Sequence, residues 1–434
     1  MKILLINYID NVGGAAIATE RLLTALRQCN VNVELGVVDK RSINPAVVLL
    51  KKKSFFDRYK IFRIYKKILE KGMPYIKQIL KQAFPATSNP IMHSTNRKTL
   101  IDINYINNSD YDLIHLHWIN NNTISIEDIA KITKPIVWTM HDTWVFCGAE
   151  HHPNVLEDDM RFIEGYVKAN KPKTTIGPDV CRKTWERKKR AWKKCNFYFV
   201  SPSNYEKKAF DTSALFNNTK DTCTLIPNIV PEGIFKPFNK KTLRELYHIP
   251  VDKKVIGFGA ASEITGKKSI KGDYLLIESI KKIQDKSDYH LVIFGNQTPS
   301  FANEIKLLTF ATGFITNPYI LAGIYNLCDV FVCPSLVENL PNVCLESLFC
   351  GTPVAAFNTG GIPDIVEHKK TGYLAKCFDT DDLLNGILFC IDNNEALSKN
   401  SIAKAHAEFD NETIVKKHIE LYESVLGCHS KEEW

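Results

Sequence analysis

KILLINYI at residues 2–9, DNVGGA at 10–15, AIATERLLTALRQCN at 16–30 and VNVELGVVD at 31–39 follow one another without a break. The first and last of these runs have the length and the Val/Ile/Leu content of buried strands. The run between them carries apolar residues at helical spacing. We therefore predict a strand–loop–helix–strand unit, which is the building block of a parallel sheet covered by helices on both faces.

The same rhythm continues along the chain in two series. A proline-rich segment, IPNIVPEGIFKPFNKKT, separates the series and is the best candidate for a linker. Two such series predict an α/β protein with two doubly wound domains, at residues 1–229 and 230–409, and a last helix at about 410–434 that packs back on the first domain. The later strands predicted in the first series are YDLIHLHW, PIVWTMHD, NFYFVSPS and CTLIPN. The strands predicted in the second series are KKVIGFGAAS, YHLVIFGN, DVFVCPS and TPVAAFN, with helices at about 272–283, near 320–327 and from about 342. The last segment, HAEFDNETIVKKHIELYESVL, is expected to form an amphipathic helix.

The composition of the 434-residue chain, 44% apolar and 24% charged, is typical of a soluble globular protein. The sequence contains no run of 18 apolar residues and no signal-peptide pattern, so we expect a cytoplasmic protein. Its 12 cysteines include no CxxC pair and many lie in apolar runs. That usage is typical of free, buried thiols, and it argues against a cysteine-based metal site.

Positive charge is concentrated in two segments. Residues 51–81 hold eleven Lys/Arg and two acids, and residues 182–194 hold eight Lys/Arg and one Glu. The first segment has aromatic residues at helical spacing, so we predict two basic amphipathic helices inserted at about 50–85. Such segments bind phosphate, acidic lipid or nucleic acid. An ordinary solvated helix face is an equally good interpretation.

Several candidate site residues follow predicted strands, where ligands of parallel sheets collect. Gly13 and Gly14 let backbone N–H groups approach an anion closely, although a plain tight turn has the same pattern. His115, His117 and His141 end two strands, and His141 is the best placed of them to meet a substrate. Their spacing matches no metal-binding motif.

The second domain offers a basic group after its first strand. GFGAAS, around Gly259, resembles half of a dinucleotide fingerprint but lacks the third glycine. Lys271 and Gly272 precede a predicted helix, where an ammonium group can meet a phosphate. Lys267 and Lys268 lie close by in sequence. The alternative for these lysines is a solvated loop.

ENLPNVCLE, at residues 338–346, is the strongest local feature. Pro341 suits the first turn of a helix, whose free N–H groups from Leu340 to Val343 can face a phosphate. Glu338 and Glu346 can accept hydrogen bonds only, so they suit hydroxyl groups. A diphosphate between two polyols, as in a nucleotide sugar, has this pattern. The alternative is a buried Glu paired with an Arg or Lys from elsewhere in the chain.

The segment PSLVENLPNVCLESLFCGTPVAAFNTGGIPDIVEHKKTGYL resembles the donor-binding signature of retaining glycosyltransferases of the GT-B fold, family GT4. The glutamate pair, the early Gly-Gly, the strand-end histidine, VSPSN, IPN and the Lys-Gly fall in the order of that family. HLHW and MHDTW resemble its capsule, O-antigen and colanic-acid branch. The resemblance spans most of the chain and implies two Rossmann-like domains that face a cleft.

The resemblance also implies roles for these residues. Glu346 would hold the ribose and Glu338 the transferred hexose. The backbone amides of the continuous segment Asn339, Leu340, Pro341, Asn342 and Val343 would cradle the diphosphate. Lys271 would neutralise the leaving diphosphate beside Gly272, Gly259, Lys267 and Lys268. Gly13 and Gly14 would close from the other domain, and His141 would touch the sugar. One departure stands out, because Ala260 occupies the place of the family's usual arginine.

The implied reaction transfers a hexose, with retention and without a metal or other cofactor. The expected acceptor is a saccharide, polyprenyl-pyrophosphate-linked, at the cytoplasmic face of the inner membrane, in surface polysaccharide synthesis. No nucleic acid is expected as a partner. Two alternatives stay open. One is a GT-B nucleotide-sugar epimerase, and the other is a non-enzymatic protein that binds nucleic acid or lipid through its basic segments.

Overall fold

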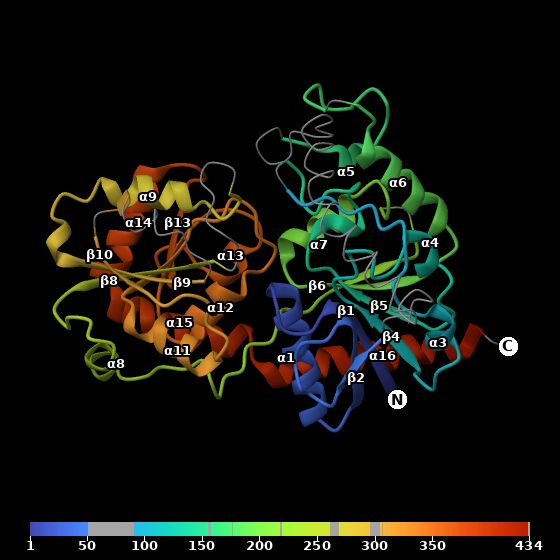
Figure 1. Cartoon of the computed structure of the whole chain (residues 1–434), viewed down its shortest axis with the longest axis horizontal. Coiled ribbons are helices and arrows are strands. Elements are labelled where there is room, and N and C mark those ends of the chain that lie inside the picture. Colours follow the sequence, from blue (N-terminus) through green and yellow to red (C-terminus); the bar gives the residue numbers. More distant parts are fainter. Residues whose placement is uncertain are drawn as a thin grey trace, which may run out of the picture.

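A computed structural model of the chain describes residues 1–50, 91–154, 158–175, 177–217, 219–260, 269–295, 304–305 and 307–432. Within these residues the chain forms two lobes, each built on one parallel sheet (Figure 1). This arrangement confirms the predicted pair of doubly wound domains. The basic segment at 51–81, Lys267, Lys268 and the side chain of Ala260 lie outside the described residues. The predicted domain boundaries stay predictions.

The N-terminal lobe contains a parallel sheet of seven described strands. The first strand lies near its centre, paired with the second and fourth. In spatial order the strands are β3 (Val47–Leu49), β2 (Asn32–Asp39), β1 (Lys2–Ile9), β4 (Leu113–Leu116), β5 (Ile136–Thr139), β6 (Phe197–Ser201) and β7 (Thr222–Leu225). The described helices are α1 (Gly14–Gln28), α3 (Ile103–Asn107), α4 (Ile126–Ile129), the 3-10 helix η2 (Thr143–Val145), α5 (Arg161–Glu164), α6 (Val180–Ala191) and α7 (Asn204–Thr212).

The C-terminal lobe has a parallel sheet of six described strands. Sequence patterning missed the short strands β3, β10 and β13, because three or four residues at a sheet edge carry little periodicity. The strands are β10 (Leu308–Ala311), β9 (Tyr289–Gly295), β8 (Lys254–Ala260), β11 (Val330–Cys333), β12 (Val354–Phe357) and β13 (Gly372–Ala375). The helices are α8 (Lys240–Leu246), α9 (Asp273–Lys281), α11 (Pro318–Leu327), α12 (Asn342–Phe349), α13 (Ile362–Ile365), α14 (Thr380–Asp392), α15 (Asn394–Glu408) and α16 (Asn411–Glu432).

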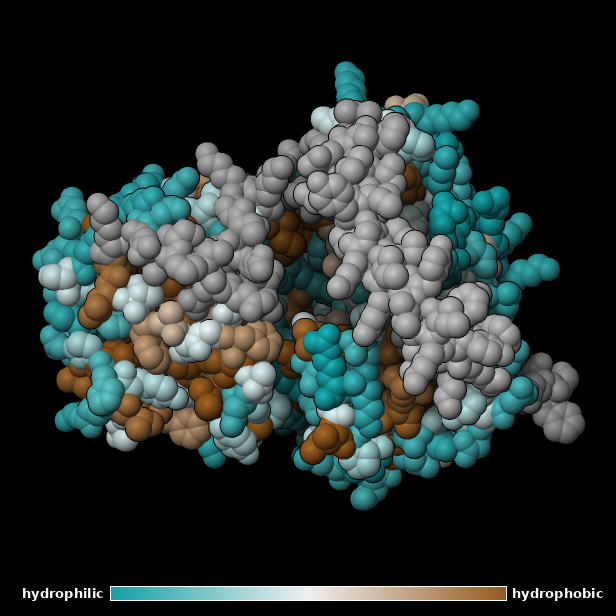
Figure 2. Space-filling view, in the orientation of Figure 1, coloured by the Kyte–Doolittle hydropathy of each residue, from teal (hydrophilic) through white to brown (hydrophobic). Residues whose placement is uncertain are grey.

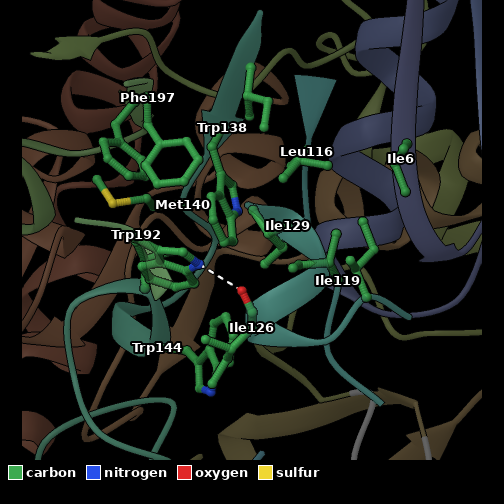
Figure 3. Packing of buried hydrophobic residues seen from close by; sticks show 14 of the residues in the cluster. Ile6, Leu116, Ile119, Ile126, Ile129, Trp138, Met140, Trp144, Trp192 and Phe197 are labelled. Carbon is green, nitrogen blue, oxygen red and sulfur yellow. Dashed lines mark hydrogen bonds between the residues drawn. The ribbon is translucent and has the colours of Figure 1, made fainter. Parts of the chain in front are cut away.

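Each sheet is buried on both faces, which explains why its strands are apolar without alternation. In β1, Ile3 and Leu5 pack toward α1 and α16, while Leu4 and Ile6 pack toward the opposite face. That opposite face contains the tryptophan cluster shown in Figure 3, in which the indole of Trp192 donates to the backbone oxygen of Ile126 at 2.9 Å. These paired cores give the N-terminal lobe a rigid edge on which loops can hold a site.

The last helix, predicted at about 410–434, is α16 and begins at Asn411, whereas the first residues of the segment HAEFDNETIVKKHIELYESVL belong to the preceding helix. Helix α15 ends at Glu408, and Phe409 and Asp410 separate it from α16. The carboxylate of Asp410 accepts from the N–H of Thr413 at 2.7 Å, which caps the new helix. The break lets α16 leave the C-terminal lobe and run along the N-terminal lobe, where Tyr422 is fully buried (Figure 1).

The basic segment at 182–194, for which anion binding and a solvated helix face were both open, is only partly exposed. The ammonium of Lys188 is fully buried and donates to the backbone oxygens of Trp144, Cys147 and Gly148. Arg187 pairs with Glu127 at 2.6 Å. The exposed basic side chains of this segment are Lys183, Lys189, Arg190, Lys193 and Lys194. No helix in the described part of the chain combines the length and apolar composition needed to cross a bilayer.

Candidate active site

A hollow lies between the two lobes in the space-filling view (Figure 2). Residues of both lobes line a cavity of about 940 Å³, including Arg21 of α1, Phe314 and Tyr319 near the start of α11, and Glu346 of α12. Ligands of doubly wound folds bind beyond the carboxyl ends of parallel strands. Of the residues predicted from the sequence for the site, Glu346 lines this cavity, and the others are placed below by their own contacts.

The start of α12 presents free backbone N–H groups, as predicted from ENLPNVCLE. Pro341 is the N-cap residue with φ −69° and ψ 116°, and its carbonyl accepts from the N–H of Cys344 at 3.0 Å. Helix geometry leaves the preceding N–H groups of Asn342 and Val343 without an intrahelical acceptor. This end of α12 can therefore hydrogen-bond an anion.

Two glycines hold the loop before α12 in place. A side chain at Gly360 would place its Cβ 1.8 Å from the carbonyl oxygen of Glu338, and Gly360 has a positive φ of 55°. The N–H of Gly361 donates to that same carbonyl oxygen at 3.2 Å. The NTGG motif after β12 thus supports Glu338 and Asn339 through backbone packing that only glycine permits.

Lys271 and Glu338, which are 67 positions apart, form one ion pair. The Lys271 Nζ donates to the Glu338 Oε1 at 2.5 Å. The Lys271 side chain is 34% exposed and that of Glu338 is 14% exposed, so the pair is largely but not fully buried. Burial alone would lower the pKa of Lys271, but the Glu338 carboxylate outweighs it and raises that pKa. The lysine is therefore a permanent cation in this site.

Gly272 explains how Lys271 reaches Glu338. Its φ is +67°, and a Cβ there would lie 1.8 Å from the carbonyl oxygen of Pro334. The Leu336 N–H also donates to the carbonyl oxygen of Ile270 at 2.8 Å. The loop before α9 therefore lies against the loop after β11 with no room for a side chain. This close approach brings the lysine beside the glutamate.

The Gly13–Gly14 loop faces α12 from the N-terminal lobe. The Asn342 Nδ2 donates to the carbonyl oxygen of Gly14 at 3.2 Å. Asn228, from the segment after β7, donates to the Asn342 Oδ1 at 3.1 Å. Gly13 is the N-cap of α1, and a Cβ built there would meet nothing within 4 Å. The two predicted phosphate-facing backbones are thus brought together from opposite lobes.

Asn339 joins the lobes through its side chain, a role that the sequence did not reveal. Its Nδ2 donates to the Met140 carbonyl oxygen at 3.0 Å and to the Glu206 Oε2 at 2.5 Å. Its Oδ1 accepts from the Ser203 hydroxyl at 2.6 Å. Burial raises the pKa of Glu206 well above its usual range, which favours the neutral carboxyl. Asn339 therefore positions the α12 loop against β5 and β6.

The structure brings the three predicted histidines into one row, with ring centroids 4.3 Å apart between His115 and His117 and 5.2 Å apart between His117 and His141. His115 is fully buried between the Tyr422 hydroxyl and the Thr139 hydroxyl, both at 2.8 Å, so its role is structural. His141 is half-buried and its Nε2 lies 2.9 Å from the Nδ1 of His117. Burial lowers the pKa of His141 to about 4, which leaves a neutral ring near neutral pH. His141 follows Met140, whose carbonyl oxygen accepts from Asn339 of the other lobe, and the contact of His141 with a sugar stays a prediction.

His151 and His152 were missed by the sequence reasoning. The His151 Nδ1 lies 2.6 Å from the Asp142 Oδ2, and the Trp118 indole donates to the same oxygen at 3.0 Å. Burial lowers the pKa of His152 to about 4, and the charges of Glu338 and Lys271 act on it in opposite directions. His152 is therefore near the Lys271–Glu338 pair. The sequence signal that could have found His151 and His152 is their adjacent position directly after TWVFCGAE.

Glu346 is buried and already has two protein partners. Its Oε1 accepts from the Arg21 guanidinium at 2.6 Å, and its Oε2 accepts from the Tyr325 hydroxyl at 2.8 Å. The pairing with an arginine matches the alternative reading of this carboxylate. A carboxylate has about four acceptor positions, so two remain for a ligand in the adjoining cavity. The ribose-binding role of Glu346 stays a prediction.

Gly259 has a packing reason for being glycine. It pairs with Phe294 across β8 and β9, and a Cβ there would lie 2.1 Å from the Phe294 ring. The contact of Gly259 with the donor substrate stays a prediction, as do the contacts of Leu340, Lys267 and Lys268 with it. Among the described residues, the histidines at the strand ends do not form a candidate metal-ligand group.

Comparison with known proteins agrees with this geometry. Residues 256–393 match the family model described as glycosyl transferases group 1. The D-inositol 3-phosphate glycosyltransferase of Corynebacterium jeikeium is 28% identical over 43% of this chain and 49% of its own length. The N,N'-diacetylbacillosaminyl-diphospho-undecaprenol alpha-1,3-N-acetylgalactosaminyltransferase of Campylobacter jejuni is 25% identical over 53% of this chain and 60% of its own length.

The fold as a whole is matched more completely than the sequence. The structure of Anabaena Alr3699/HepE in complex with UDP and glucose superposes with a TM-score of 0.63, covering 98% of this chain and 100% of that one at 18% identity. The two lobes therefore have the GT-B fold. The sequence pattern of group 1 glycosyl transferases is carried by the C-terminal lobe, and the chain spans only about half to three fifths of the curated relatives.

Proposed function

We propose that this protein is a metal-independent, retaining glycosyltransferase that moves a hexose from a nucleotide diphosphate sugar to a saccharide acceptor. The observation that carries the proposal is the Lys271–Glu338 pair, held at 2.5 Å. It belongs to the segment that matches group 1 glycosyl transferases. Glu338 of this pair lies on the loop that leads into α12 and its free amides, and the start of α12 contacts the Gly13–Gly14 loop of the other lobe.

The donor is proposed to lie along α12. The N–H groups of Asn342 and Val343 and the ammonium of Lys271 would bind the diphosphate, because they supply positive potential without a metal. Glu338 would accept hydrogen bonds from the hexose, and Glu346 from the ribose. Glu346 lines a cavity of about 940 Å³, which supports the ribose end of this placement, whereas the diphosphate end rests on the contacts of Lys271 and the start of α12.

The proposed reaction takes place on one face of the sugar. The bond between the acceptor oxygen and the anomeric carbon forms as the bond between that carbon and the phosphate oxygen breaks. The acceptor's proton passes to the leaving phosphate, so atoms and charges balance. Lys271 and the α12 amides stabilise the charge that develops on the diphosphate. His141 orients the sugar as a neutral hydrogen-bonding group.

The acceptor is proposed to be polyprenyl-pyrophosphate-linked, in surface polysaccharide synthesis at the cytoplasmic face of the inner membrane. The Campylobacter jejuni relative, which is named for a diphospho-undecaprenol substrate, supports this. The five exposed basic side chains of the 182–194 segment would contact anionic lipid. Vesicles containing phosphatidylglycerol should bind the protein at low salt and release it at high salt. Absence of binding at low salt contradicts the membrane part of the proposal.

The transferase proposal is tested by thermal shift against a panel of UDP-, GDP- and dTDP-sugars, followed by product analysis. One donor should raise the melting temperature, because it binds only the folded state. With that donor and a lipid-linked acceptor, NMR should show an α-linked product from an α-linked donor. Inverted product contradicts retention. Isomerised nucleotide sugar without acceptor would indicate the epimerase, and no stabilisation by any donor would favour a non-enzymatic protein.

A further inference from the structure

A second cluster of reactive side chains lies in the N-terminal lobe, away from the residues assigned to the donor. His93, Glu150 and Cys181 each offer a metal-ligand atom, and these atoms all lie within 4.8 Å of one another. Glu150 and Cys181 are buried, with 1% and 5% of their surfaces exposed. The three residues come from the segment before α3, the loop after η2 and the start of α6. The predicted site does not use any of them.

The free atoms of this cluster point to a ligand. The His93 Nδ1 lies 2.7 Å from the carbonyl oxygen of Ile91, which fixes the proton on Nδ1 and leaves a lone pair on Nε2. That Nε2 and the Glu150 Oε2 are both buried without a hydrogen-bond partner among the described residues. Buried polar atoms are rarely left unpaired, because desolvation is costly.

The surroundings orient the ligands as a metal site requires. The Tyr166 hydroxyl donates to the Glu150 Oε1, which turns the other carboxylate oxygen toward His93 and Cys181. Metal ligands normally have such outer hydrogen bonds. Gly148 makes room, since a Cβ there would lie 2.7 Å from the Glu150 Oε2 and 2.6 Å from the Cys181 carbonyl oxygen.

The charges nearby favour a cation. Arg161 has its NH2 4.0 Å from the Glu150 Oε1, but it also pairs with Asp159 at 2.8 Å and lies 3.6 Å from Asp179. Burial lowers the pKa of Lys188 to about 7, so this lysine, which donates to the Cys147 and Gly148 carbonyls, does not add a full positive charge near neutral pH. The three carboxylates therefore outnumber the permanent cation Arg161, and this excess of negative charge favours a bound cation.

We propose that His93 Nε2, Glu150 Oε2 and Cys181 Sγ bind a Zn²⁺ ion that ties together the three segments carrying them. A nitrogen, an oxygen and a sulfur ligand suit Zn²⁺ better than Mg²⁺ or Ca²⁺, which prefer oxygen alone. Ligands bound tetrahedrally at about 2.0–2.3 Å lie about 3.3–3.8 Å apart, so small side-chain rotations close the site. Water completes the coordination. The ion stabilises the loop that follows His141 and Asp142, without a step in transfer.

Sequence spacing could not reveal this site. His93 precedes Glu150 by 57 residues, and Cys181 follows it by 31, so no short motif exists. The expectation that the protein lacks a metal was based on the absence of such motifs and on the resemblance to a family whose reaction needs no metal. The zinc proposal is independent of the proposed transfer reaction and is tested without measuring activity.

The test measures metal retention by the full chain. Purified protein is stripped with EDTA, loaded with Zn²⁺ or Co²⁺, desalted and analysed by mass spectrometry of its metal content. Wild type should keep about one ion per chain, and the Co²⁺ form should show a sulfur-to-cobalt charge-transfer band. Wild type that keeps no metal, or a Co²⁺ form without that band, overturns the proposal.

Variants locate the ion. Cys181→Ala and Glu150→Gln should keep at least tenfold less Zn²⁺ than wild type, whereas Cys390→Ala, which removes a buried thiol of the other lobe, should keep the same amount. Equal retention by Cys181→Ala contradicts the site, and a thiol hydrogen-bonded to Glu150 then explains the cluster. If Cys181→Ala fails to fold, Zn²⁺ should still slow alkylation of Cys181 in wild type, and unchanged alkylation contradicts binding there.

Discussion

The two glutamates of ENLPNVCLE lie eight positions apart but belong to different kinds of contact. Glu338, at 14% exposure, pairs with Lys271 of the same lobe. Glu346, at 4% exposure, pairs with Arg21 of the opposite lobe and with Tyr325. The first pair is assembled by two loops of the C-terminal sheet. The second exists only when the two lobes are together.

This difference separates the residues proposed to act in the reaction from the residues that hold the two lobes together. Loops held by Gly272 and Gly360 fix Lys271 and Glu338 before a donor arrives, so the pair needs no domain movement. Arg21–Glu346 and the Asn339 contacts with Ser203 and Glu206 instead join the lobes. We expect substitutions in the first group to affect turnover and those in the second to affect stability and donor affinity.

The largest expected effect is on turnover. Lys271→Ala and Glu338→Gln should each lower kcat roughly a thousandfold, because they remove a charge or acceptor positioned at the reacting sugar and diphosphate. Steady-state kinetics with the identified donor measures this effect. Lys282→Ala, which breaks the exposed pair with Asp381, is the matched control and should be unchanged. Wild-type turnover in either site variant would falsify the catalytic assignment.

The interlobe pair should show its effect in stability. Arg21→Ala leaves the buried Glu346 carboxylate without its cation, so the free energy of unfolding should fall by about 3 kcal/mol and donor KM should rise. Urea unfolding and donor titration measure the two quantities. Arg41→Ala breaks the exposed pair with Asp39 and should change stability by less than about 1 kcal/mol. Similar losses of unfolding free energy in both variants would show that the interlobe ion pair stabilises the protein no more than an exposed pair does.

The histidines on the N-terminal side of the cleft predict acid sensitivity. Burial lowers the pKa of His141 to about 4, below the value of about 6.5 in unfolded chains, so the unfolded state binds more protons between these values. Stability should therefore decrease as pH falls through that window, by about 2 kcal/mol at pH 5 for this group. Urea midpoints at pH 7 and pH 5 measure it. An equally steep loss in His141→Asn contradicts this origin.

The smallest expected effect is a loss of stability from removing a helix-capping carboxylate outside the site. Asp379 caps α14 by accepting from the N–H groups of Asp381 and Asp382 at 3.1 and 3.0 Å. Asp379→Ala should lower stability by about 1 kcal/mol and leave transfer unchanged. Thermal unfolding and kinetics of the same preparation measure both. Loss of transfer without loss of stability would contradict the capping role and indicate that Asp379 acts in the reaction.

Much of the fold was predictable because strand burial and helix periodicity are local. The runs that form β1, β2, β8 and β11 were found, as was the start of α12 at Asn342. The last helix was expected from about 410 and begins at Asn411. The contacts that hold its start were not predictable, because the Asn411 N–H donates to Glu232 and the Asn411 side-chain amide donates to the Val230 carbonyl, both in the linker.

The candidate site divides in the same way. Glu338, Lys271, Gly14 and Asn342 carry recognisable chemistry in short motifs, and the sequence alone pointed to them together. The partners Arg21, Glu206 and His152, and the cluster of His93, Glu150 and Cys181, emerged only from the folded chain. Each is an ordinary residue in its local context. Their significance comes from contacts between residues that are tens to hundreds of positions apart, which packing creates and which no local pattern of residues encodes.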